Sequence, residues 1–367
     1  MGILKIDINE FLLLSRNNFV FDVRSPGEFF HAHIPGALSL PLFSDDERAV
    51  VGTAYKQQSR SVAIKLGLDF FGLKMRKIIE EVEEKTKGKK GPEIGSPIFV
   101  HCWRGGMRSA AIAWLLDLYG FKVYTLAGGY KSYRKWVLEQ CNKEYQFKII
   151  GGFTGSGKTP LLKQLESFGE KIIDLEGLAN HKGSAFGALG EQPQPSQEMF
   201  ENLLANELFS KSGAKQKEES EAPWILLEDE SQRIGRLTVP IHIWNVMRLS
   251  PLIFVKIDFE ARLRYLVETY GSYDKESLVA GITRIQKRLG GLETKTAINF
   301  ILEDDHAECF KILLKYYDRL YTKGLNNRNG LTELLQYADC NEVDPLSNGD
   351  QIKKILAITS SMKQYSA

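Results

Sequence analysis

The sequence predicts an α/β protein with two domains, the second of which ends in a mostly helical region. Two observations predict this fold class. Short apolar runs alternate with longer amphipathic runs, which is the pattern of parallel sheets covered by helices. The chain has 367 residues, more than one hydrophobic core usually organises and enough for two ordinary domains. We place the domains at residues 1–140 and 141–367, with the boundary between Gln140 and Tyr145.

The individual elements follow from periodicity and from flanking turn residues. Apolar runs that predict buried strands are Phe19–Val23, Ile98–His101, Phe147–Gly151, Lys171–Leu175, Trp224–Leu227 and Leu252–Ile257. Amphipathic stretches that predict helices are Arg108–Leu118, Leu161–Ser167, Glu276–Leu289 and Glu308–Tyr321. Two charged, glycine-bearing stretches without periodicity, Glu83–Pro97 and Ser210–Ala222, predict solvated loops.

The composition is typical of a globular protein and argues against several functional classes. Hydrophobic residues make up 43% and charged residues 26%, and the net charge of +2 carries no bulk signature of nucleic-acid binding. An RNA partner would therefore be held by a local basic patch. The four cysteines show neither C-x-x-C nor metal-ligand spacing, which argues against disulfides and zinc: Cys102, Cys141, Cys309 and Cys340. No apolar run approaches the length of a membrane span, so we expect a cytoplasmic protein without a membrane partner.

A cysteine at a strand-to-helix turn forms the first candidate site. Residues His101–Ser109 read HCWRGGMRS, directly after an apolar strand and directly before a helix. Backbone N–H groups and the positive end of a helix meet at such a turn and favour a thiolate at Cys102. Arg104 and Arg108 add guanidinium groups suited to an oxyanion, so we predict Cys102, Arg104 and Arg108 as catalytic residues. A structural cysteine at a strand end would need neither these arginines nor the two glycines.

A glycine-rich turn forms the second candidate site. Residues Gly152–Thr159 read GFTGSGKT, a full G-x-x-x-x-G-K-[ST] motif between an apolar strand and a helix. Its backbone N–H groups and lysine cradle a polyphosphate, and its threonine hydroxyl is a ligand for Mg²⁺. The predicted phosphate-binding residues are Gly152, Thr154, Gly155, Ser156, Gly157, Lys158 and Thr159. The sequence contains no N-K-x-D element to specify a base, which leaves room for a diphosphate that is not a nucleotide.

Acidic residues at the end of another predicted strand extend this site. Trp224–Glu230 reads WILLEDE, and P-loop proteins usually place a metal-side carboxylate at the end of such a strand. We predict Thr159, Glu228 and Glu230 as Mg²⁺ ligands, while Asp174 and Glu176, which follow the strand after the P-loop helix, are alternatives. For each single carboxylate, a solvated acidic turn is the competing interpretation.

Residues 1–140 resemble the rhodanese family. Three matching pieces occur in the family's usual order: FDVRSPGEFFHAHIPGALSLP (Phe21–Pro41), the strand-cysteine loop, and GFKVYTLAGGYKSYRKW (Gly120–Trp136). The resemblance implies that Cys102 carries sulfur or selenium as a persulfide or perselenide, and that Asp22 and Arg24 brace the loop. The C-x5-R spacing is one residue longer than in the commonest single-domain rhodaneses and also occurs in cysteine phosphatases of the same fold. Phosphatase chemistry therefore stays open.

The order of the two motifs and their connecting sequences resemble one family, tRNA 2-selenouridine synthase. Further matching pieces are ERAVVGTAYKQ (Glu47–Gln57), DLEGLANHKGSAFG (Asp174–Gly187) and LLEDESQRIG (Leu226–Gly235). The resemblance implies a rhodanese-like domain followed by a P-loop NTPase-like α/β domain with a helical C-terminal part. It further implies that wobble 2-thiouridine in tRNA is S-geranylated with geranyl diphosphate, and that selenium from selenophosphate then replaces the geranylated sulfur. An enzyme that supplies selenophosphate is the further partner that this chemistry implies.

Two other activities stay open at this stage. One is an ATP- or GTP-dependent tRNA sulfurtransferase, and the other is a nucleotide-sensing module with a vestigial rhodanese domain, which the intact C-x5-R loop disfavours. Ser59 stands where the resembling family has a glycine, and His181 and Lys182 are candidates for contacts with the diphosphate or the RNA. Basic residues that could form the RNA patch are Arg233, Arg236, Arg248, Arg262, Arg264, Arg284, Lys287 and Arg288.

Overall fold

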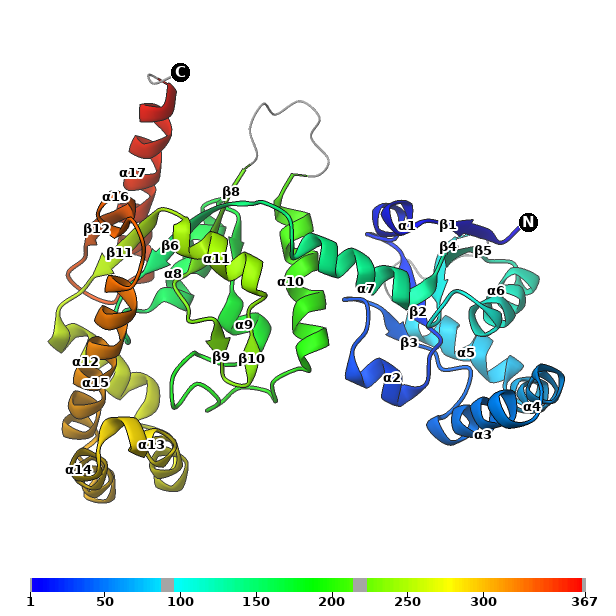
Figure 1. The fold of residues 1–367 in the computed structure, drawn as a ribbon, viewed down its shortest axis with the longest axis horizontal. Helices are drawn as coiled ribbons and strands as arrows, with labels where there is room; N and C mark the ends of the chain where they lie inside the picture. Colours follow the sequence, from blue (N-terminus) through cyan, green and yellow to red (C-terminus); the bar gives the residue numbers. More distant parts are fainter. Residues whose placement is uncertain (1, 87–95, 214–222, 365–367) are drawn as a thin grey trace. The chain divides into compact units, whose positions relative to one another are not determined.

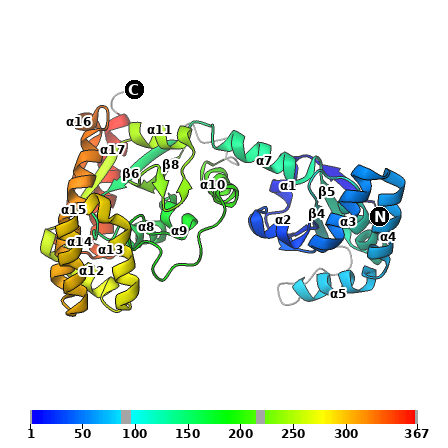
Figure 2. The same ribbon diagram turned by 60° about the horizontal axis from the view of Figure 1, so that its bottom comes forward.

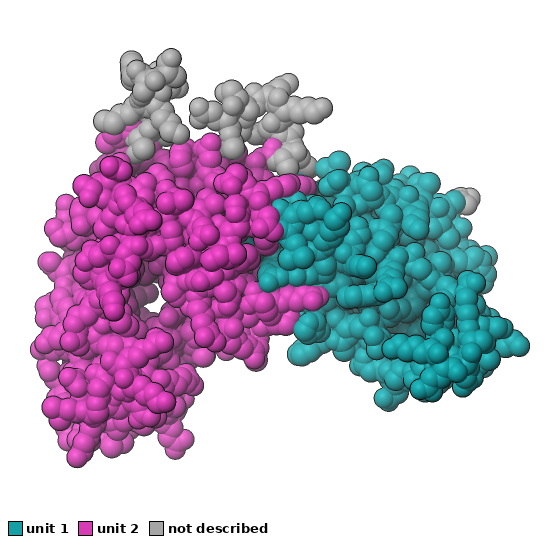
Figure 3. All heavy atoms as spheres, in the orientation of Figure 1, with its two compact units in different colours: residues 1–140, 201–206 teal, residues 141–200, 207–367 magenta. Residues whose placement is uncertain are grey.

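The protein is described by a computed structural model that covers residues 2–86, 96–213 and 223–364. The chain divides into two compact units, which are coloured separately in Figure 3. Unit 1 consists of Met1–Gln140 and Glu201–Asn206, and unit 2 of Cys141–Phe200 and Glu207–Ala367. Most of the two predicted loops, residues 87–95 and 214–222, lies outside the described residues, and both loops were predicted to begin too early, because residues 83–86 and 210–211 are helical.

Unit 1 is built on a five-stranded parallel sheet with the strand order β1-β5-β4-β2-β3 (Figure 1). The strands are β1 (Leu4–Ile6), β2 (Phe19–Asp22), β3 (Leu38–Ser39), β4 (Pro97–His101) and β5 (Lys122–Leu126). Strand β4 lies in the middle and pairs with both β2 and β5. Cys102 therefore follows the central strand at the carboxyl edge of the sheet, where open α/β sheets place their binding sites.

The helices of unit 1 pack on this sheet and bury its apolar residues. They are α1 (Ile8–Leu14), α2 (Pro26–His31), α3 (Asp45–Gln57), α4 (Arg60–Gly72), α5 (Met75–Thr86), α6 (Met107–Tyr119) and α7 (Gly129–Gln140). Helix α1 contacts α7, and α5 contacts α6. Ser59 caps α4, because its hydroxyl accepts a hydrogen bond from the backbone N–H of Val62 at 3.2 Å. Ser59 thus has a structural role at the start of a helix.

Unit 2 is built on a second five-stranded parallel sheet, with the order β12-β11-β6-β8-β7. Its strands are β6 (Gln146–Gly151), β7 (Ile172–Ile173), β8 (Trp224–Glu228), β11 (Leu252–Lys256) and β12 (Leu335–Asp339), and β9 (Arg233–Ile234) forms an antiparallel hairpin with β10 (Leu237–Thr238). Strand β6 is central, so the glycine-rich turn that follows it lies at the carboxyl edge of this sheet. Strand β8 lies next to β6 and brings Glu228 to the same edge.

The helices of unit 2 surround the sheet and form a separate helical cluster. They are α8 (Lys158–Ser167), α9 (Leu175–Ala179), α10 (Gln197–Lys211), α11 (Ile241–Leu249), α12 (Phe259–Tyr270), α13 (Lys275–Leu289), α14 (Gly291–Leu302), α15 (His306–Asn326), α16 (Leu331–Leu334) and α17 (Pro345–Gln364). Figures 1 and 2 show α13 and α14 side by side, and α14 also contacts α15, which packs on α12. Buried apolar residues such as Leu278, Ile282 and Phe310 form the core of this cluster.

The predicted fold class is confirmed, and one predicted strand is wrong in its extent. The predicted strand Lys171–Leu175 contains only Ile172–Ile173 in the structure, and Leu175 begins helix α9. The reason is local: the carboxylate of Asp174 accepts a hydrogen bond from Gly177 N at 2.7 Å and caps the helix. Among the described residues, no helix is both long and apolar enough to cross a membrane.

Candidate active sites

Cys102 lies in a loop that is tied to the beginning of helix α7. The side chain is 3% exposed. The carbonyl oxygen of Cys102 accepts a hydrogen bond from Tyr130 N at 2.8 Å, and that of Trp103 accepts one from Lys131 N at 3.0 Å. Gly105 has a φ of +61°, and a Cβ there would lie 2.5 Å from the carbonyl oxygen of Leu126. A residue with a side chain would therefore push the loop away from β5.

Hydrogen bonds around the sulfur favour the thiolate form of Cys102. Gly106 N donates to Sγ at 3.4 Å, and Ser109 Oγ lies 3.2 Å from Sγ. Burial opposes ionisation of the thiol, but hydrogen bonds from Ser109, Gly106 and Arg104 outweigh it and hold the pKa of Cys102 below its usual value. The loop also lies at the start of α6, where the helix dipole is positive. The site therefore has the properties of a nucleophilic or chalcogen-carrying cysteine.

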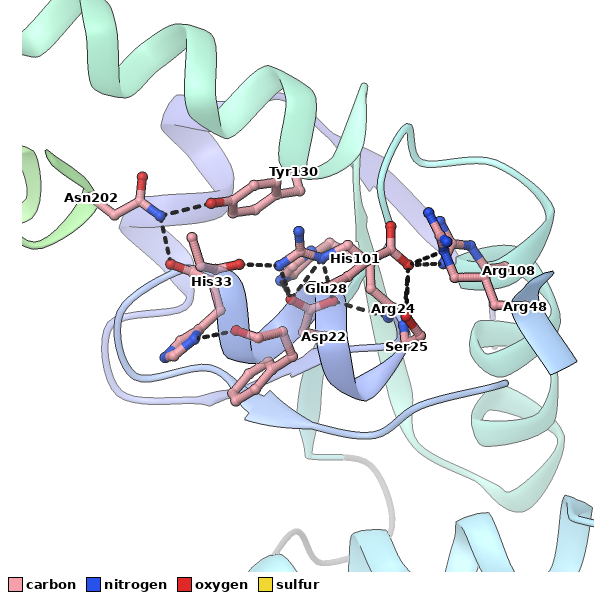
Figure 4. A network of polar contacts seen from close by, with 12 residues as sticks. Asp22, Arg24, Ser25, Glu28, His33, Arg48, His101, Arg108, Tyr130 and Asn202 are labelled. Atoms are coloured by element: carbon pink, nitrogen blue, oxygen red, sulfur yellow. Dashed lines mark hydrogen bonds and ion pairs between the residues drawn. The ribbon is translucent and has the colours of Figure 1, made fainter. Parts of the chain in front are cut away.

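The two predicted catalytic arginines differ in their surroundings. Arg104 is exposed beside the cysteine. Arg108 is engaged elsewhere: its Nη1 donates to Glu28 Oε2 at 2.7 Å, and Arg48 Nε lies 2.9 Å from the same carboxylate oxygen (Figure 4). Burial alone would raise the pKa of the Glu28 carboxyl. The neighbouring Arg108 and Arg48 outweigh burial, so the net pKa lies below its usual value and Glu28 is a carboxylate. Arg108 therefore links the Cys102 loop to α2, and Arg104 is the arginine with an exposed side chain.

Asp22 and Arg24 form a buried pair beneath this edge of the sheet. Arg24 Nη2 donates to Asp22 Oδ2 at 2.6 Å and to the carbonyl oxygen of Ala32 at 2.7 Å. The Arg24 guanidinium also lies 3.7 Å from the centroid of the Tyr130 ring. Figure 4 shows Arg24 between Asp22 and Tyr130, with His101 beside them. Burial lowers the pKa of His101, and neither ring nitrogen has a hydrogen-bond partner in the described part of the chain.

The glycine-rich turn in unit 2 has the geometry of a phosphate cradle. It spans Gly152–Thr159 between β6 and α8, and Lys158 Nζ donates to the carbonyl oxygen of Gly152 at 3.1 Å. Gly157 has a φ of +68° and immediately precedes α8, so its conformation turns the chain into the helix. The start of α8 adds the positive end of a helix dipole to this turn. Two N–H groups of the turn have partners within the protein, because Ser156 N donates to the carbonyl oxygen of Phe153 at 3.1 Å and Gly152 N to the Tyr321 hydroxyl at 3.3 Å.

Carboxylates from two segments, the start of α9 and the end of β8, meet beside the P-loop. Thr159 Oγ1 donates to Glu176 Oε2 at 2.8 Å, and Glu176 N donates to Glu228 Oε1 at 2.8 Å. Glu228 is fully buried, and its Oε2 has no partner among the residues that the structure describes. Burial together with the neighbouring Glu176 raises the pKa of Glu230 to about 8. Burial also raises the pKa of Glu176 and of Glu228, so the three groups do not all ionise at neutral pH.

Asp229, between two of these glutamates, belongs to a different network. Arg328 Nη2 donates to Asp229 Oδ1 at 2.6 Å, and the Tyr321 hydroxyl donates to Asp229 Oδ2 at 2.6 Å. The same hydroxyl accepts a hydrogen bond from Gly152 N at 3.3 Å. Asp229 therefore connects the P-loop to helix α15, which sequence reasoning did not foresee because 92 residues separate Tyr321 from Asp229.

A cavity of about 560 Å³ opens on the P-loop of unit 2. Its polar end is formed by the residues Thr154–Thr159 with Glu176, Lys182 and Glu230. An apolar wall of the cavity comes mainly from α12 and α15: Leu266, Tyr270, Phe310, Leu313, Leu314, Tyr317 and Leu320. This wall reaches the P-loop, because a Cβ on Gly155 would lie 3.1 Å from Leu266 Cγ. The sequence pattern predicted Glu308–Tyr321 as a helix, but an apolar helix face that lines a cavity has the same periodicity as one that packs in a core. This wall was therefore missed.

Several other predicted polar residues make contacts within the protein. Lys182 lines the cavity and lies 3.2 Å from Glu191, and His181 Nδ1 accepts a hydrogen bond from Gly183 N at 3.1 Å. Arg262 is 3% exposed and pairs with Asp318. Internal acceptors also engage Arg236, Arg248, Arg264 and Arg284. Most of the basic residues that the sequence offered for RNA contacts are therefore partly used to hold the fold.

Comparisons with known proteins agree with this arrangement. A rhodanese-like domain model matches residues 9–135, and a model described as the tRNA 2-selenouridine synthase AAA domain matches residues 145–344. The tRNA 2-selenouridine synthase of Sulfurovum sp. (strain NBC37-1) is 34% identical over 343 residues, which cover 84% of this chain and 89% of the relative. That of Pseudomonas putida (strain W619) is 33% identical over 338 residues, and these cover 82% and 87%. That of Shewanella halifaxensis (strain HAW-EB4) is 32% identical over 357 residues, with coverage of 88% and 93%.

The fold and the two sites define a two-domain enzyme in which a rhodanese-like cysteine domain precedes a P-loop domain. Both domain models match in that order, and the relatives cover nearly the whole chain. This chain belongs to the tRNA 2-selenouridine synthase family. It is accordingly an enzyme of the transferase type that modifies tRNA.

Proposed function

We propose that this enzyme replaces sulfur by selenium in wobble 2-thiouridine of tRNA through an S-geranylated intermediate. In the first step, the thiocarbonyl sulfur attacks C1 of geranyl diphosphate, a C–S bond forms, the C–O bond breaks and pyrophosphate leaves. In the second step, selenium from selenophosphate adds at C2 of the uridine, and geranyl thiol leaves. Water then cleaves the P–Se bond and phosphate is released. Alkylation makes the sulfur a group that can depart.

The observation that carries this proposal is the two-sided cavity of unit 2. The P-loop residues Thr154–Thr159, which we assign to the phosphates, line the same cavity as the apolar residues Leu266, Phe310, Leu313 and Leu320. A diphosphate attached to a hydrocarbon chain matches both halves, because apolar surface contributes roughly 25 cal/mol per Å² buried. ATP and GTP would bring a polar base and ribose toward this wall. The cavity therefore favours a prenyl diphosphate over a nucleotide.

Residues of the P-loop would bind the diphosphate and stabilise it as it departs. We assign this role to Gly152, Thr154, Gly155, Ser156, Gly157, Lys158 and Thr159, whose N–H groups and lysine charge suit the negative charge that develops on the leaving group. Lys158 Nζ is held by the carbonyl oxygen of Gly152, at the mouth of the turn. In unit 1, the Cys102 loop would hold selenophosphate, with Arg104 binding its phosphate oxygens. Arg108 would position the loop through Glu28.

Mg²⁺ fits the acidic end of the cavity. Glu176 and Glu230 reach one point, because a Cβ on Gly183 would lie 2.8 Å from Glu176 Oε1 and 2.7 Å from Glu230 Oε2. The described residues contain no cluster of three or more metal-ligating side chains, and Mg²⁺ usually takes one or two carboxylates with phosphate and water oxygens. Thr159, Glu176 and Glu230 would hold the ion, which neutralises phosphate charge when bound. Glu228 does not line the cavity and would orient Glu176 through its backbone N–H.

The reaction has consequences for where and with what the enzyme works. Its RNA substrate carries 2-thiouridine at the wobble position, and selenophosphate is unstable enough to need an enzyme that supplies it. We infer that the protein works in the cytoplasm, where thiolated tRNA is made and a reactive thiol stays reduced.

The test is a reconstitution with defined substrates. The full chain is incubated with tRNA containing 2-thiouridine, geranyl diphosphate, selenophosphate and Mg²⁺, and the nucleosides are analysed by mass spectrometry. We expect S-geranylated uridine when selenophosphate is left out and 2-selenouridine when it is present. Formation of neither nucleoside contradicts the proposal. Nucleotide turnover stimulated by tRNA, without use of geranyl diphosphate, would instead identify an ATP- or GTP-dependent sulfurtransferase. Release of phosphate from phosphoesters by a reaction that needs Cys102 would identify a phosphatase.

A further inference from the structure

The indole of Trp103 is exposed directly beside the buried thiol of Cys102. Trp103 is 36% exposed, whereas Cys102 is 3% exposed. The indole packs against the ring of Tyr130, whose backbone N–H donates to the carbonyl oxygen of Cys102 at 2.8 Å, so it lies at the cysteine loop. Large aromatic side chains dominate the energetics of protein cores and interfaces, and one left in water beside a reactive group is available for a ligand. The exposed Arg104 follows in the sequence.

A rigid support holds this indole in place. Its ring centroid lies 5.7 Å from that of Tyr130, with an angle of 36° between the planes. Tyr130 is fully buried; the guanidinium of Arg24 lies over its ring, and Asn202 Nδ2 donates to its hydroxyl at 2.8 Å (Figure 4). The backbone of Trp103 is also fixed, through its carbonyl oxygen and Lys131 N. The orientation of the indole is thus set by the same contacts that hold the Cys102 loop.

We propose that Trp103 is the stacking platform on which the target uridine base lies while its C2 position faces Cys102. This inference rests on the proposed function, which brings a tRNA base to the cysteine. Proteins bind unpaired RNA bases by stacking them on aromatic side chains, and the flat face of a pyrimidine is suited to an indole. Trp103 is accordingly a substrate-positioning residue rather than a participant in bond formation.

Helix α6 provides a matched control. Trp114 is 49% exposed and lies seven residues beyond Met107, the first residue of α6, which is about 10 Å along the helix. It has the same ring and greater exposure but lies away from the cysteine. A general apolar contact with RNA or protein would use both tryptophans, whereas stacking at the reaction centre requires Trp103 alone.

The experiment compares Trp103→Ala, Trp103→Phe and Trp114→Ala in the full chain. The first readout is the dissociation constant of a dye-labelled anticodon stem-loop RNA that carries 2-thiouridine at the wobble position, measured by anisotropy beside the same RNA with uridine. Tryptophan fluorescence of the protein is recorded in the same titration. The second readout is KM and kcat for selenation of geranylated tRNA. Removing one base–aromatic stack should raise the dissociation constant and KM roughly 5- to 150-fold for Trp103→Ala. Trp103→Phe should recover most of the affinity, and Trp114→Ala should behave like the wild type.

Separate results distinguish this inference from the proposed function. Alkylation of Cys102 by iodoacetamide at the wild-type rate shows that the loop of Trp103→Ala is intact. RNA can bind even where no selenouridine forms. If it then quenches the wild-type tryptophan fluorescence and this quenching is lost in Trp103→Phe, the result supports stacking of the base on Trp103. Equal effects of Trp103→Ala and Trp114→Ala, or RNA binding and KM unchanged by Trp103→Ala, would overturn it.

Discussion

Replacing Ser109 by alanine should raise the pKa of the Cys102 thiol. The Ser109 hydroxyl lies 3.2 Å from Cys102 Sγ, and both residues are almost completely buried. A hydrogen bond to a charged group contributes about 1.5–3 kcal/mol, and 1.36 kcal/mol corresponds to one pKa unit, so the full effect is about one to two units. The same hydroxyl can donate to the carbonyl oxygen of Gly106 at 3.1 Å instead. We therefore expect the lower value, about one unit.

The pH dependence of alkylation measures this shift. A thiol whose pKa is raised by one unit has about tenfold less thiolate at low pH, but the remaining thiolate is about threefold more nucleophilic, since the Brønsted coefficient is about 0.4–0.5. Iodoacetamide should therefore label Cys102 of Ser109→Ala about threefold more slowly below both pKa values and about threefold faster above them. Labelling is followed by mass spectrometry of the Cys102 peptide.

Two controls separate this electrostatic effect from a change in structure. Thr86→Val removes another buried hydroxyl, which donates to the carbonyl oxygen of Val82 and lies on a different helix. It should leave the labelling profile of Cys102 unchanged. Burial raises the pKa of Cys309 to about 12, so this thiol should stay unreactive in every variant that is folded. A labelling rate for Ser109→Ala that keeps the wild-type midpoint pH, or that is reduced equally at all pH values, would contradict a raised pKa of Cys102.

Three further predictions concern which unit carries out which step of the proposed reaction. Cys102→Ser should abolish formation of 2-selenouridine while S-geranylated uridine accumulates, as measured by nucleoside mass spectrometry; loss of geranylation in a well-folded variant would contradict separate roles. Lys158→Ala should slow geranylation by about 10²-fold or more, the usual cost of losing one electrostatic donor to a leaving group, while a pre-geranylated tRNA is still selenated. Leu320→Glu places a charge on the apolar wall of the cavity. It should raise KM for geranyl diphosphate by about tenfold and leave inhibition by pyrophosphate unchanged.

The sequence predicted the parts of the sites that are local in the chain. Each site combines its reactive residues, glycines and flanking strand in one short stretch, Ile98–Arg108 and Phe147–Thr159, so the motif and its structural context could be recognised together. The family and the fold class followed from these motifs and their connectors, and both are confirmed. The cap at Asp174 was equally local, but the apolar pair before it was interpreted as the middle of a longer strand.

The partners of these residues could not be predicted, because they come from distant segments. Glu28, which binds Arg108, lies 80 residues away in the chain, and Glu176, which binds Thr159, lies 17 residues away on another helix. A carboxylate of either kind is indistinguishable in the sequence from a solvated acidic residue. Sequence reasoning therefore assigned Arg108 directly to an oxyanion and Thr159 directly to a metal ion. The structure adds the protein groups that already engage both side chains.

Helix α15 contributes to both parts of the proposed geranyl diphosphate site. Its residues Leu313 and Leu320 line the apolar wall, while its Tyr321 binds Gly152 N and Asp229. Asp318 on the same helix holds Arg262, which donates to the carbonyl oxygen of Thr154 in the P-loop. The wall that would accept a prenyl chain and the contacts that shape the phosphate cradle are therefore parts of one rigid element. A ligand that displaces this wall would also distort the P-loop. The fit of the prenyl group against α15 and the position of the departing pyrophosphate in the P-loop are therefore linked.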